Sequence, residues 1–228
     1  MGPREQGAVA EPRNVRVALV EDEELVRVLL ERALGVTEGI RVVRSVSGAQ
    51  EALLTIGPGS CDVAVLDVNL VDGNGVSLAL QLQRQDPGLA VVLLSSQDVM
   101  GLFESVQGQA TRPWSYLSKR SSFTPHVLGD AVKAAAAGRV VLDPYLAQRS
   151  VPRAGTALSG LTPAQFRVLR LVAEGLSNTA IAHRLGVGDR TVESHLLAIY
   201  RHLELDGNES NRRVRAVLVF MEQTGRMP

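Results

Sequence analysis

The chain has 228 residues, of which 45% are hydrophobic, and its 24 basic and 24 acidic side chains give a net charge of zero. This length predicts one or two domains, and no apolar run approaches the ~20 residues that a membrane-spanning helix requires. The single cysteine, Cys61, excludes an internal disulfide and a cysteine-based metal site. Because no basic and then apolar leader opens the chain, we expect a cytoplasmic protein that contacts no membrane.

The charged side chains are unevenly distributed along the chain. Residues 1–143 carry 13 basic and 17 acidic side chains, a net charge of −4. Residues 144–228 carry 11 basic and 7 acidic side chains, a net charge of +4. An acidic half joined to a basic half predicts two domains, the second of which faces a polyanion.

The first half begins with a polar stretch, residues 1–14, that contains Gly and Pro and predicts a flexible tail. Residues 15–143 then alternate between short apolar runs and segments with helical periodicity. Strands are expected over residues 15–20, 40–46, 61–66, 90–94 and 114–117. Helices are expected over residues 49–56, 76–85, 100–109 and 125–137, and after the first strand, where Leu25, Val28, Leu29 and Leu34 recur at helical spacing. This alternation predicts a five-stranded parallel sheet with helices on both faces.

Polar side chains stand where these strands end: Glu21 and Asp22, Asp67, Ser95 and Lys119. The ends of parallel strands meet at one edge of the sheet. Three carboxylates together would repel one another unless a hard cation such as Mg²⁺ lies between them. A carboxylate beside Mg²⁺ can accept a phosphoryl group, whose oxygens Lys119 and the Ser95 hydroxyl could hold. Each acid taken alone could instead cap a helix, but the set together predicts a phosphorylation site.

Residues 15–143 resemble the receiver domain of two-component response regulators. The resemblance rests on the motifs LVEDEELVR, VLDVNLVDGNG, LLS, SYLSK and GRVVLDP. It implies a doubly wound, flavodoxin-like fold with Asp67 as the phosphoacceptor, Lys119 as the phosphoryl partner, and Ser95 and Tyr116 as switch residues. It also implies that Mg²⁺ is held by Glu21, Asp22, Asp67 and the backbone carbonyl of Asn69.

The receiver-like segment departs from the family pattern at several positions. Val71 stands where the family usually has Pro, and Arg112, Pro113 and Trp114 look inserted. Arg120 follows Lys119 where many receivers have Pro. These departures keep open an alternative in which a small-molecule ligand or a protein contact controls the receiver in place of phosphorylation.

The second half is expected to be helical after a linker over residues 144–157, which is rich in Pro, Gly, Ala and Arg without periodicity. Thr162-Pro163 predicts the start of a first helix, and Ser177 caps a second. After the turn Gly186–Gly188, a third helix is expected over residues 190–203, which completes a helix-turn-helix. A fourth helix over residues 211–224 carries an apolar stripe that we expect to pair two copies of the chain: Val214, Val217, Leu218 and Met221.

The segment LTPAQFRVLRLVAEGLSNTAIAHRLGVGDRTVESHLLAIYRHL resembles the LuxR-type DNA-binding domain, here residues 158–228. Together with the receiver, it places the chain in the NarL/FixJ subfamily of response regulators. We expect the Ser177/Asn178 end of the second helix to meet DNA phosphates. On the third helix we assign Arg190, Thr191 and Arg201 to phosphates, and Glu193, Ser194 and Leu197 to base edges.

The sequence therefore predicts a transcriptional response regulator that is not an enzyme. Its expected partners are a sensor histidine kinase that phosphorylates Asp67, Mg²⁺, double-stranded promoter DNA and a second copy of itself, and RNA polymerase is a further candidate. A phosphatase that uses Asp67 as its nucleophile is disfavoured, because the position that would need an acid/base carboxylate is Asn69.

Overall fold

The computed structural model describes residues 14–96 and 110–226. The helix expected over residues 100–109 and all but the last residue of the expected tail lie outside the described residues. The first domain is built, in chain order, from β1 Val15–Val20, α1 Glu24–Gly35, β2 Ile40–Val46, α2 Ala49–Thr55, β3 Val63–Asp67, β4 Asn69–Leu70, β5 Gly73–Asn74, α3 Gly75–Gln85, β6 Ala90–Ser95, β7 Ser115–Ser118, α5 Lys119–Ser122 and α6 Pro125–Ala136.

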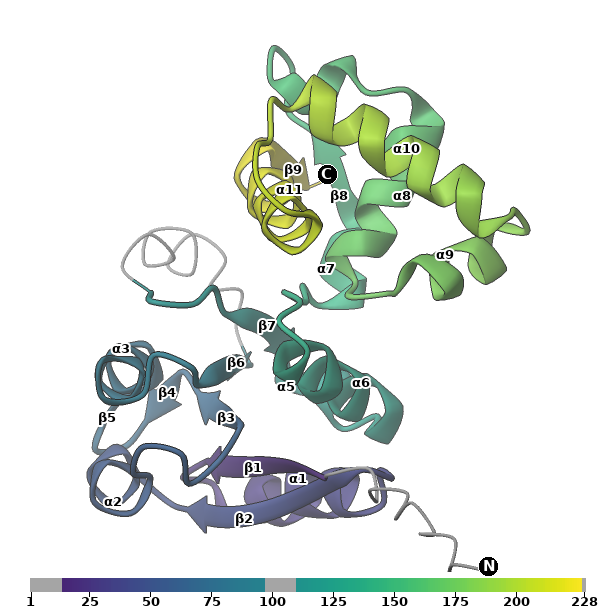
Figure 1. Ribbon diagram of the computed structural model, residues 1–228. Helices are drawn as coiled ribbons and strands as arrows, with labels where there is room; N and C mark the ends of the chain where they lie inside the picture. The colour runs from purple at the N-terminus through teal and green to yellow at the C-terminus, as the bar shows by residue number, and fades with distance from the viewer. Residues whose placement is uncertain (1–13, 97–109, 227–228) are drawn as a thin grey trace, which may run out of the picture.

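The five long strands form one sheet in the order β2-β1-β3-β6-β7, with all neighbouring strands parallel. Alternate side chains of each strand point to opposite faces, so β3 supplies Val63 and Val65 to one apolar layer and Ala64 and Leu66 to the other. Helices α1 and α6 cover the first face, and α2 and α3 cover the second (Figure 1). The predicted doubly wound fold is confirmed.

Helix α1 buries only part of the apolar stripe that its periodicity predicted. Leu25 is 72% exposed and Leu29 is 42% exposed, whereas Leu30 and Leu34 are fully buried against the sheet. The apolar residues of this helix span an arc wider than the stripe that meets the sheet, so sequence spacing alone did not decide which of them face inward.

The second domain consists of α7 Pro144–Arg149, β8 Ser150–Pro152, the 3₁₀ turn Ala157–Gly160, α8 Pro163–Ala173, α9 Asn178–Leu185, α10 Asp189–His202, α11 Glu209–Gln223 and β9 Thr224–Arg226. Helix α8 opens with a reciprocal capping box between Thr162 and Gln165. The Ser177 hydroxyl caps α9, and Gly186 ends that helix in the left-handed conformation at φ 67°. Helices α9 and α10 thus form the predicted helix-turn-helix.

The prediction of a flexible linker over residues 144–157 is wrong for most of that range, because these residues form regular structure. Its first residues form α7, and β8 pairs antiparallel with β9, which joins Ser150 to Arg226 and Pro152 to Thr224 in register. The partner strand lies more than 70 positions further along the chain. Local composition therefore contained no sign of this pairing.

The apolar stripe of α11 also differs from expectation. Val217 and Met221 are buried, Val214 and Leu218 are half-buried, and the whole helix packs on α8. Phe220 stacks on Phe166 of α8 with ring centroids 5.6 Å apart. This stripe closes the core of a single copy, so Val217 and Met221 are not available to pair two copies.

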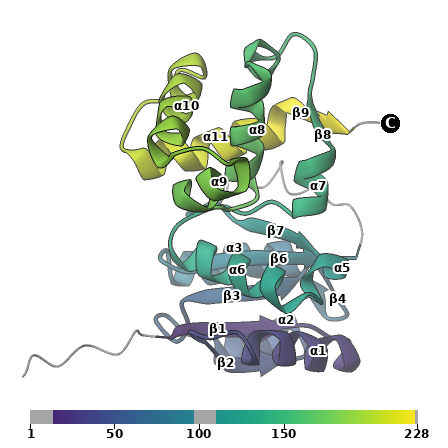
Figure 2. The same cartoon turned by 90° about the vertical axis from the view of Figure 1, so that its right-hand side faces the viewer.

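The two domains are joined by close contacts on the β7 side of the sheet, and α1 and β2 lie at the opposite end of the receiver (Figures 1 and 2). The Leu142 N–H donates to the Ala173 carbonyl at 2.7 Å, and the Arg139 guanidinium donates to the Gly175 carbonyl at 2.6 Å. A cleft of about 480 Å³ lies between α6 and α9, and Ser177 is among its lining residues. The second domain is therefore docked on the first.

The segment Arg112–Trp114, which looks inserted, holds neighbouring elements of the first domain together through hydrogen bonds. The Arg112 guanidinium donates to the carbonyls of Gly88 and Ala135, and Trp114 is fully buried. The Trp114 indole N–H donates to Gln83 Oε1 at 2.8 Å, and Gln83 Nε2 donates to the carbonyls of Leu89 and Arg112. One buried amide thus ties α3 to the segment that leads into β7, the strand that directly precedes Lys119.

Replacing this amide should destabilise the receiver. Gln83→Leu leaves the buried Trp114 N–H and two carbonyls without partners, at an expected cost of about 1–3 kcal/mol in unfolding free energy. Urea denaturation, followed by the fluorescence of Trp114, measures this change in unfolding free energy. Trp114 is the only tryptophan in the sequence. Gln85→Leu at an exposed site on the same helix is the control. Equal stabilities of the two variants would contradict the assignment.

Candidate functional site

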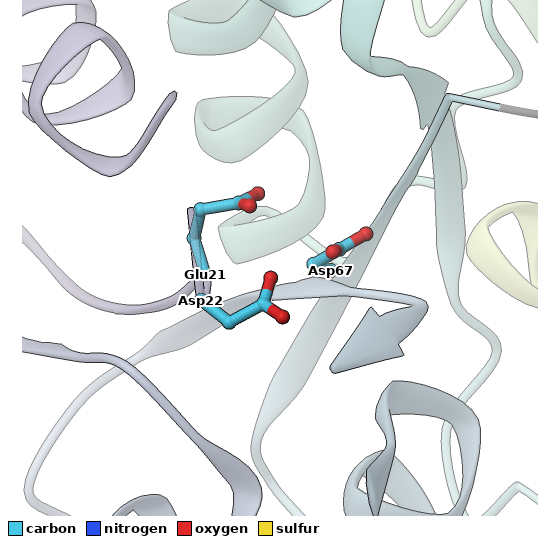
Figure 3. Close-up of side chains that lie close together, drawn as sticks. All are labelled: Glu21, Asp22 and Asp67. Carbon is cyan, nitrogen blue, oxygen red and sulfur yellow. The ribbon is translucent and has the colours of Figure 1, made fainter. Parts of the chain in front are cut away.

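The carboxyl ends of the strands gather three acids at one edge of the sheet. Glu21 and Asp22 follow β1, and Asp67 ends β3 directly beside it (Figure 3). One oxygen from each of the three carboxylates lies within 4.8 Å of the others. Glu21 and Asp67 are buried, and Asp22 is half-buried. The grouping predicted from the strand ends is present.

Lys119 reaches this cluster from the end of β7. Its Nζ lies 2.8 Å from Glu21 Oε1 and 2.9 Å from Asp67 Oδ2, and a weaker contact of 3.8 Å joins it to Glu23. Lys119 is itself buried, with a relative exposure of 7%. A single buried cation therefore bridges the two buried carboxylates, and both distances are those of charge-assisted hydrogen bonds.

The charges of this cluster are only partly compensated. Burial raises the pKa of Asp67 and of Glu21 above their ordinary values, although the hydrogen bond from Lys119 acts against that rise. Burial alone would lower the pKa of Lys119, but its hydrogen bonds to Glu21 and Asp67 outweigh burial and raise the pKa. The site accordingly favours a further positive charge beside its acids.

The residues present fit a magnesium ion. Glu21 Oε2 and Asp67 Oδ1 are buried without a hydrogen-bond partner in the described part of the chain, and such orphaned oxygens are costly unless a cation or a donor meets them. The donor set consists of carboxylate oxygens, which are hard ligands of the kind that Mg²⁺ prefers. Asn69, whose carbonyl was expected to be a further ligand, begins β4 two residues after Asp67.

The loop after Asp67 is held by its own contacts. The Val71 N–H donates to Asp22 Oδ2 at 2.9 Å, a bond that Pro at this position could not make. The Asp72 carboxylate accepts from the N–H groups of Ala49 and Gln50 and so caps α2, and these bonds lower the pKa of Asp72. In this chain the loop is therefore held at Val71 by a hydrogen bond to Asp22, a predicted metal ligand, where the family's Pro would restrict the backbone.

The two predicted switch residues occupy neighbouring strands. Ser95 is fully buried at the end of β6, in register with Ser118 of β7. Tyr116 is buried, its ring belongs to the apolar layer on the α2/α3 face, and its N–H donates to the Val141 carbonyl. Both lie near the acidic edge, and their predicted switching role stays a prediction.

The predicted reading face of α10 is open to solvent. Leu197 is 44% exposed, an unusual environment for a large apolar residue, and Ser194 bonds back to the Arg190 carbonyl. The other exposed members of this face are Arg190, Thr191, Glu193 and Arg201. At the start of α9, Ser177 is exposed, but Asn178 is half-buried and accepts from Arg213 through its amide oxygen. Asn178 is therefore engaged within the domain.

Sequence reasoning missed several residues that shape these sites. Arg27 donates from its guanidinium to the Glu21 carbonyl and so anchors α1 beside the acids. Arg213 of α11 donates to the Leu176 carbonyl and to Asn178 at the start of α9. Thr179 donates to Asp189 across the helix-turn-helix at 3.1 Å. No local sequence signal indicated Arg27 or Arg213.

Neutralising Asp67 should stabilise the metal-free protein. Because folding raises the pKa of this carboxyl, the stability it contributes is present at low pH and lost as the pH rises through the raised value. The unfolding free energy of Asp67→Asn should therefore exceed that of wild type at pH 8, and the gap should narrow as the pH falls. Mg²⁺ at a hundredfold its dissociation constant should add about 2.7 kcal/mol to wild type and less to the variant.

Urea unfolding at both pH values, with and without Mg²⁺, tests these expectations together. An Asp67→Asn variant that is less stable than wild type at pH 8 would contradict the electrostatic account. An identical Mg²⁺ response of the two proteins would contradict the assignment of Asp67 as a ligand.

Comparison with known proteins identifies both domains. Residues 17–128 match the response regulator receiver domain, and residues 159–214 match the bacterial regulatory proteins of the luxR family. No helix in the described ranges has the length and apolar character to cross a membrane.

Similar proteins align over nearly the whole chain. The DNA-binding transcriptional activator DevR/DosR of Mycobacterium tuberculosis is 32% identical, over 91% of this chain and 94% of its own. The nitrate/nitrite response regulator protein NarP of Escherichia coli is 29% identical, over 92% and 96%. The fold resembles the Salmonella typhimurium response regulator RcsB, with a TM-score of 0.52 at 20% identity over 92% of this chain and 98% of that one. The chain belongs to the NarL/FixJ-type two-component response regulators, which join a receiver to a LuxR-type DNA-binding domain.

Proposed function

We propose that Asp67 accepts a phosphoryl group from a sensor histidine kinase and that this modification controls binding of promoter DNA by a homodimer. The observation that carries the proposal is the grouping of Glu21, Asp22 and Asp67, of which the buried Glu21 and Asp67 both contact Lys119. A purely structural ion pair would not need two further buried oxygens without partners.

The chemistry follows from the position of Asp67. One Asp67 oxygen forms a bond to the incoming phosphorus while the phosphorus–nitrogen bond of the donor phosphohistidine breaks and the imidazole leaves. Lys119 already contacts Asp67 Oδ2 and is within reach of a phosphoryl oxygen on it. A bound Mg²⁺ would neutralise charge on the phosphoryl oxygens, with Glu21, Asp22, Asp67 and the Asn69 carbonyl as its ligands. The Ser95 hydroxyl and the Tyr116 ring would then adjust to the new group.

Other modes of action have less support. Control by a small-molecule ligand or a protein contact alone would leave the complete set of acids and Lys119 without a use. An aspartyl-phosphate phosphatase needs a second carboxyl group two residues after its nucleophile, and Asn69 occupies that position. We therefore propose a regulator and not an enzyme.

Phosphorylation should be confined to Asp67. Incubation with acetyl phosphate and Mg²⁺ should produce one acid-stable, base-labile adduct, because an acyl phosphate hydrolyses readily in base. Intact-mass spectrometry detects it as one phosphoryl group per chain. Asp67→Asn, or removal of the metal with a chelator, should abolish the adduct, whereas Asp86→Asn at the C-terminal end of α3 should leave it unchanged. An adduct that persists in Asp67→Asn would remove the proposal.

The exposed face of α10 supports major-groove recognition. Arg190, Thr191 and Arg201 are placed to meet phosphates, and Glu193, Ser194 and Leu197 to meet base edges. Ser177 and Asn178 would contribute at the backbone, where the Asn178 amide oxygen accepts from Arg213 and its NH2 group can donate to a phosphate. We propose that a dimer reads two half-sites related by its own two-fold axis and contacts RNA polymerase at the promoter.

Domain docking offers a route for control. Ser177 lines the cleft between α9 and the receiver helix α6, so the receiver stands close to one expected DNA contact. Leu142 donates to the carbonyl of Ala173, the last residue of α8, and Arg139 donates to the carbonyl of Gly175 just after that helix. We propose that phosphorylation alters this docking and thereby changes access to DNA.

Glu193 and Arg190 should have different effects on DNA binding. Glu193 cannot contact phosphate favourably, but it can accept from the cytosine N4 amine. Glu193→Ala should relax preference at one position per half-site, at a cost of roughly 1–3 kcal/mol. Arg190→Ala should weaken binding to all sequences alike and reduce the salt dependence. Selection from a random duplex library separates the two; an unchanged preferred sequence for Glu193→Ala would assign base reading to Ser194 and Leu197.

A further inference from the structure

Asp143 is a buried acid at the junction of the two domains, away from the acidic cluster. It is 0% exposed, and it stands immediately before α7. A carboxylate removed from water is costly unless its oxygens accept hydrogen bonds. The partners of Asp143 therefore indicate which parts of the structure this residue holds together.

Its two oxygens face different domains. Oδ2 accepts from the Ser118 N–H at 2.9 Å, at the end of receiver strand β7. Oδ1 accepts from the N–H groups of Tyr145 at 2.9 Å and Leu146 at 3.3 Å, in the first turn of α7. A helix cap alone would need only one of these oxygens.

On the receiver side, the bond ends next to the phosphorylation site. Ser118 directly precedes Lys119, whose ammonium contacts Asp67. Ser118 also caps α5, because its hydroxyl accepts from the Ser121 N–H and its carbonyl accepts from the Ser122 hydroxyl. The backbone of Lys119 and the Ser118 N–H therefore belong to one tightly bonded turn.

On the other side, the segment that carries Asp143 is bonded to the DNA-binding domain. Residues 140–142 run beside β7, where the Tyr116 N–H donates to the Val141 carbonyl at 2.8 Å. The Leu142 N–H then donates to the Ala173 carbonyl at the end of α8. Asp143 thus sits where β7, α7 and α8 meet.

We propose that Asp143 is a positioning residue that couples Lys119 to the DNA-binding domain. When Lys119 is drawn toward a phosphoryl group on Asp67, the Ser118 N–H moves with it, and Asp143 transmits that displacement to α7 and to the end of α8. This coupling rests on the proposed control by phosphorylation, and it adds the residue through which that control passes.

Asp143→Ser separates coupling from simple capping. Serine caps a helix about as well as aspartate does, but its hydroxyl is one bond shorter and offers a single oxygen, so the link to Ser118 is lost. The full chain is titrated with a duplex selected by the wild-type protein, with and without beryllofluoride and Mg²⁺. Asp86→Ser, which removes hydrogen bonds to the Gly59 and Gly88 N–H groups elsewhere in the receiver, is the matched control.

Wild type and Asp86→Ser should change their DNA affinity about tenfold on addition of beryllofluoride, a typical size for coupling between sites, and Asp143→Ser less than about twofold. By reciprocity, the duplex should change beryllofluoride affinity by the same factor in wild type and not in Asp143→Ser. A purely structural role would lower stability without removing this coupling.

Two results would overturn the role of Asp143. One is an Asp143→Ser response equal to that of wild type. The other, which needs no variant, is unchanged hydrogen exchange of the Tyr145 and Leu146 amides when beryllofluoride binds the wild-type chain. If wild-type DNA affinity itself does not respond to bound beryllofluoride, the proposed control by phosphorylation is wrong. The coupling role proposed for Asp143 is then wrong as well.

Discussion

The buried ion pair between Lys119 and the carboxylates of Asp67 and Glu21 is the constraint on which the receiver depends. Removing these groups from water is unfavourable, and one ammonium cannot satisfy the acids around it. The apolar sheet must supply the compensating free energy, which it does through strands that are buried on both faces. The site therefore has a built-in affinity for a cation and for any group that gives Lys119 a better partner.

The same sheet connects this site to the second domain. Residues 140–142 extend the sheet beyond β7, and the apolar layer on the α2/α3 face continues through Leu142 and Ala147 into the helical domain. Figure 2 shows the resulting stack, with the helical domain seated above β7 and α6. Because the linker is folded into this junction, the two domains meet through specific contacts and not through a loose tether.

Much of the fold and of the candidate site could be predicted from local pattern. The strand that ends at Asp67 is a run of buried β-branched and aliphatic residues, and the caps at Thr162, Ser177 and Gly186 are local signals that the structure confirms. Two of the errors share one cause. The pairing of β8 with β9 and the Arg213 bond to Asn178 join segments far apart in the chain, which periodicity cannot detect.

By itself, the sequence determined which residues end the strands, because alternation of apolar runs and helices dictates a parallel sheet whose carboxyl ends share one edge. It also determined the helix-turn-helix, through its caps and its turn. Tertiary structure alone decided that Leu30 of α1 faces the sheet while Leu25 faces solvent, that α11 closes its own core, and that Asp143 lies between two domains. Each of these outcomes depends on which distant surface is present to bury an apolar group or satisfy a polar one, and that surface exists only once the chain has folded.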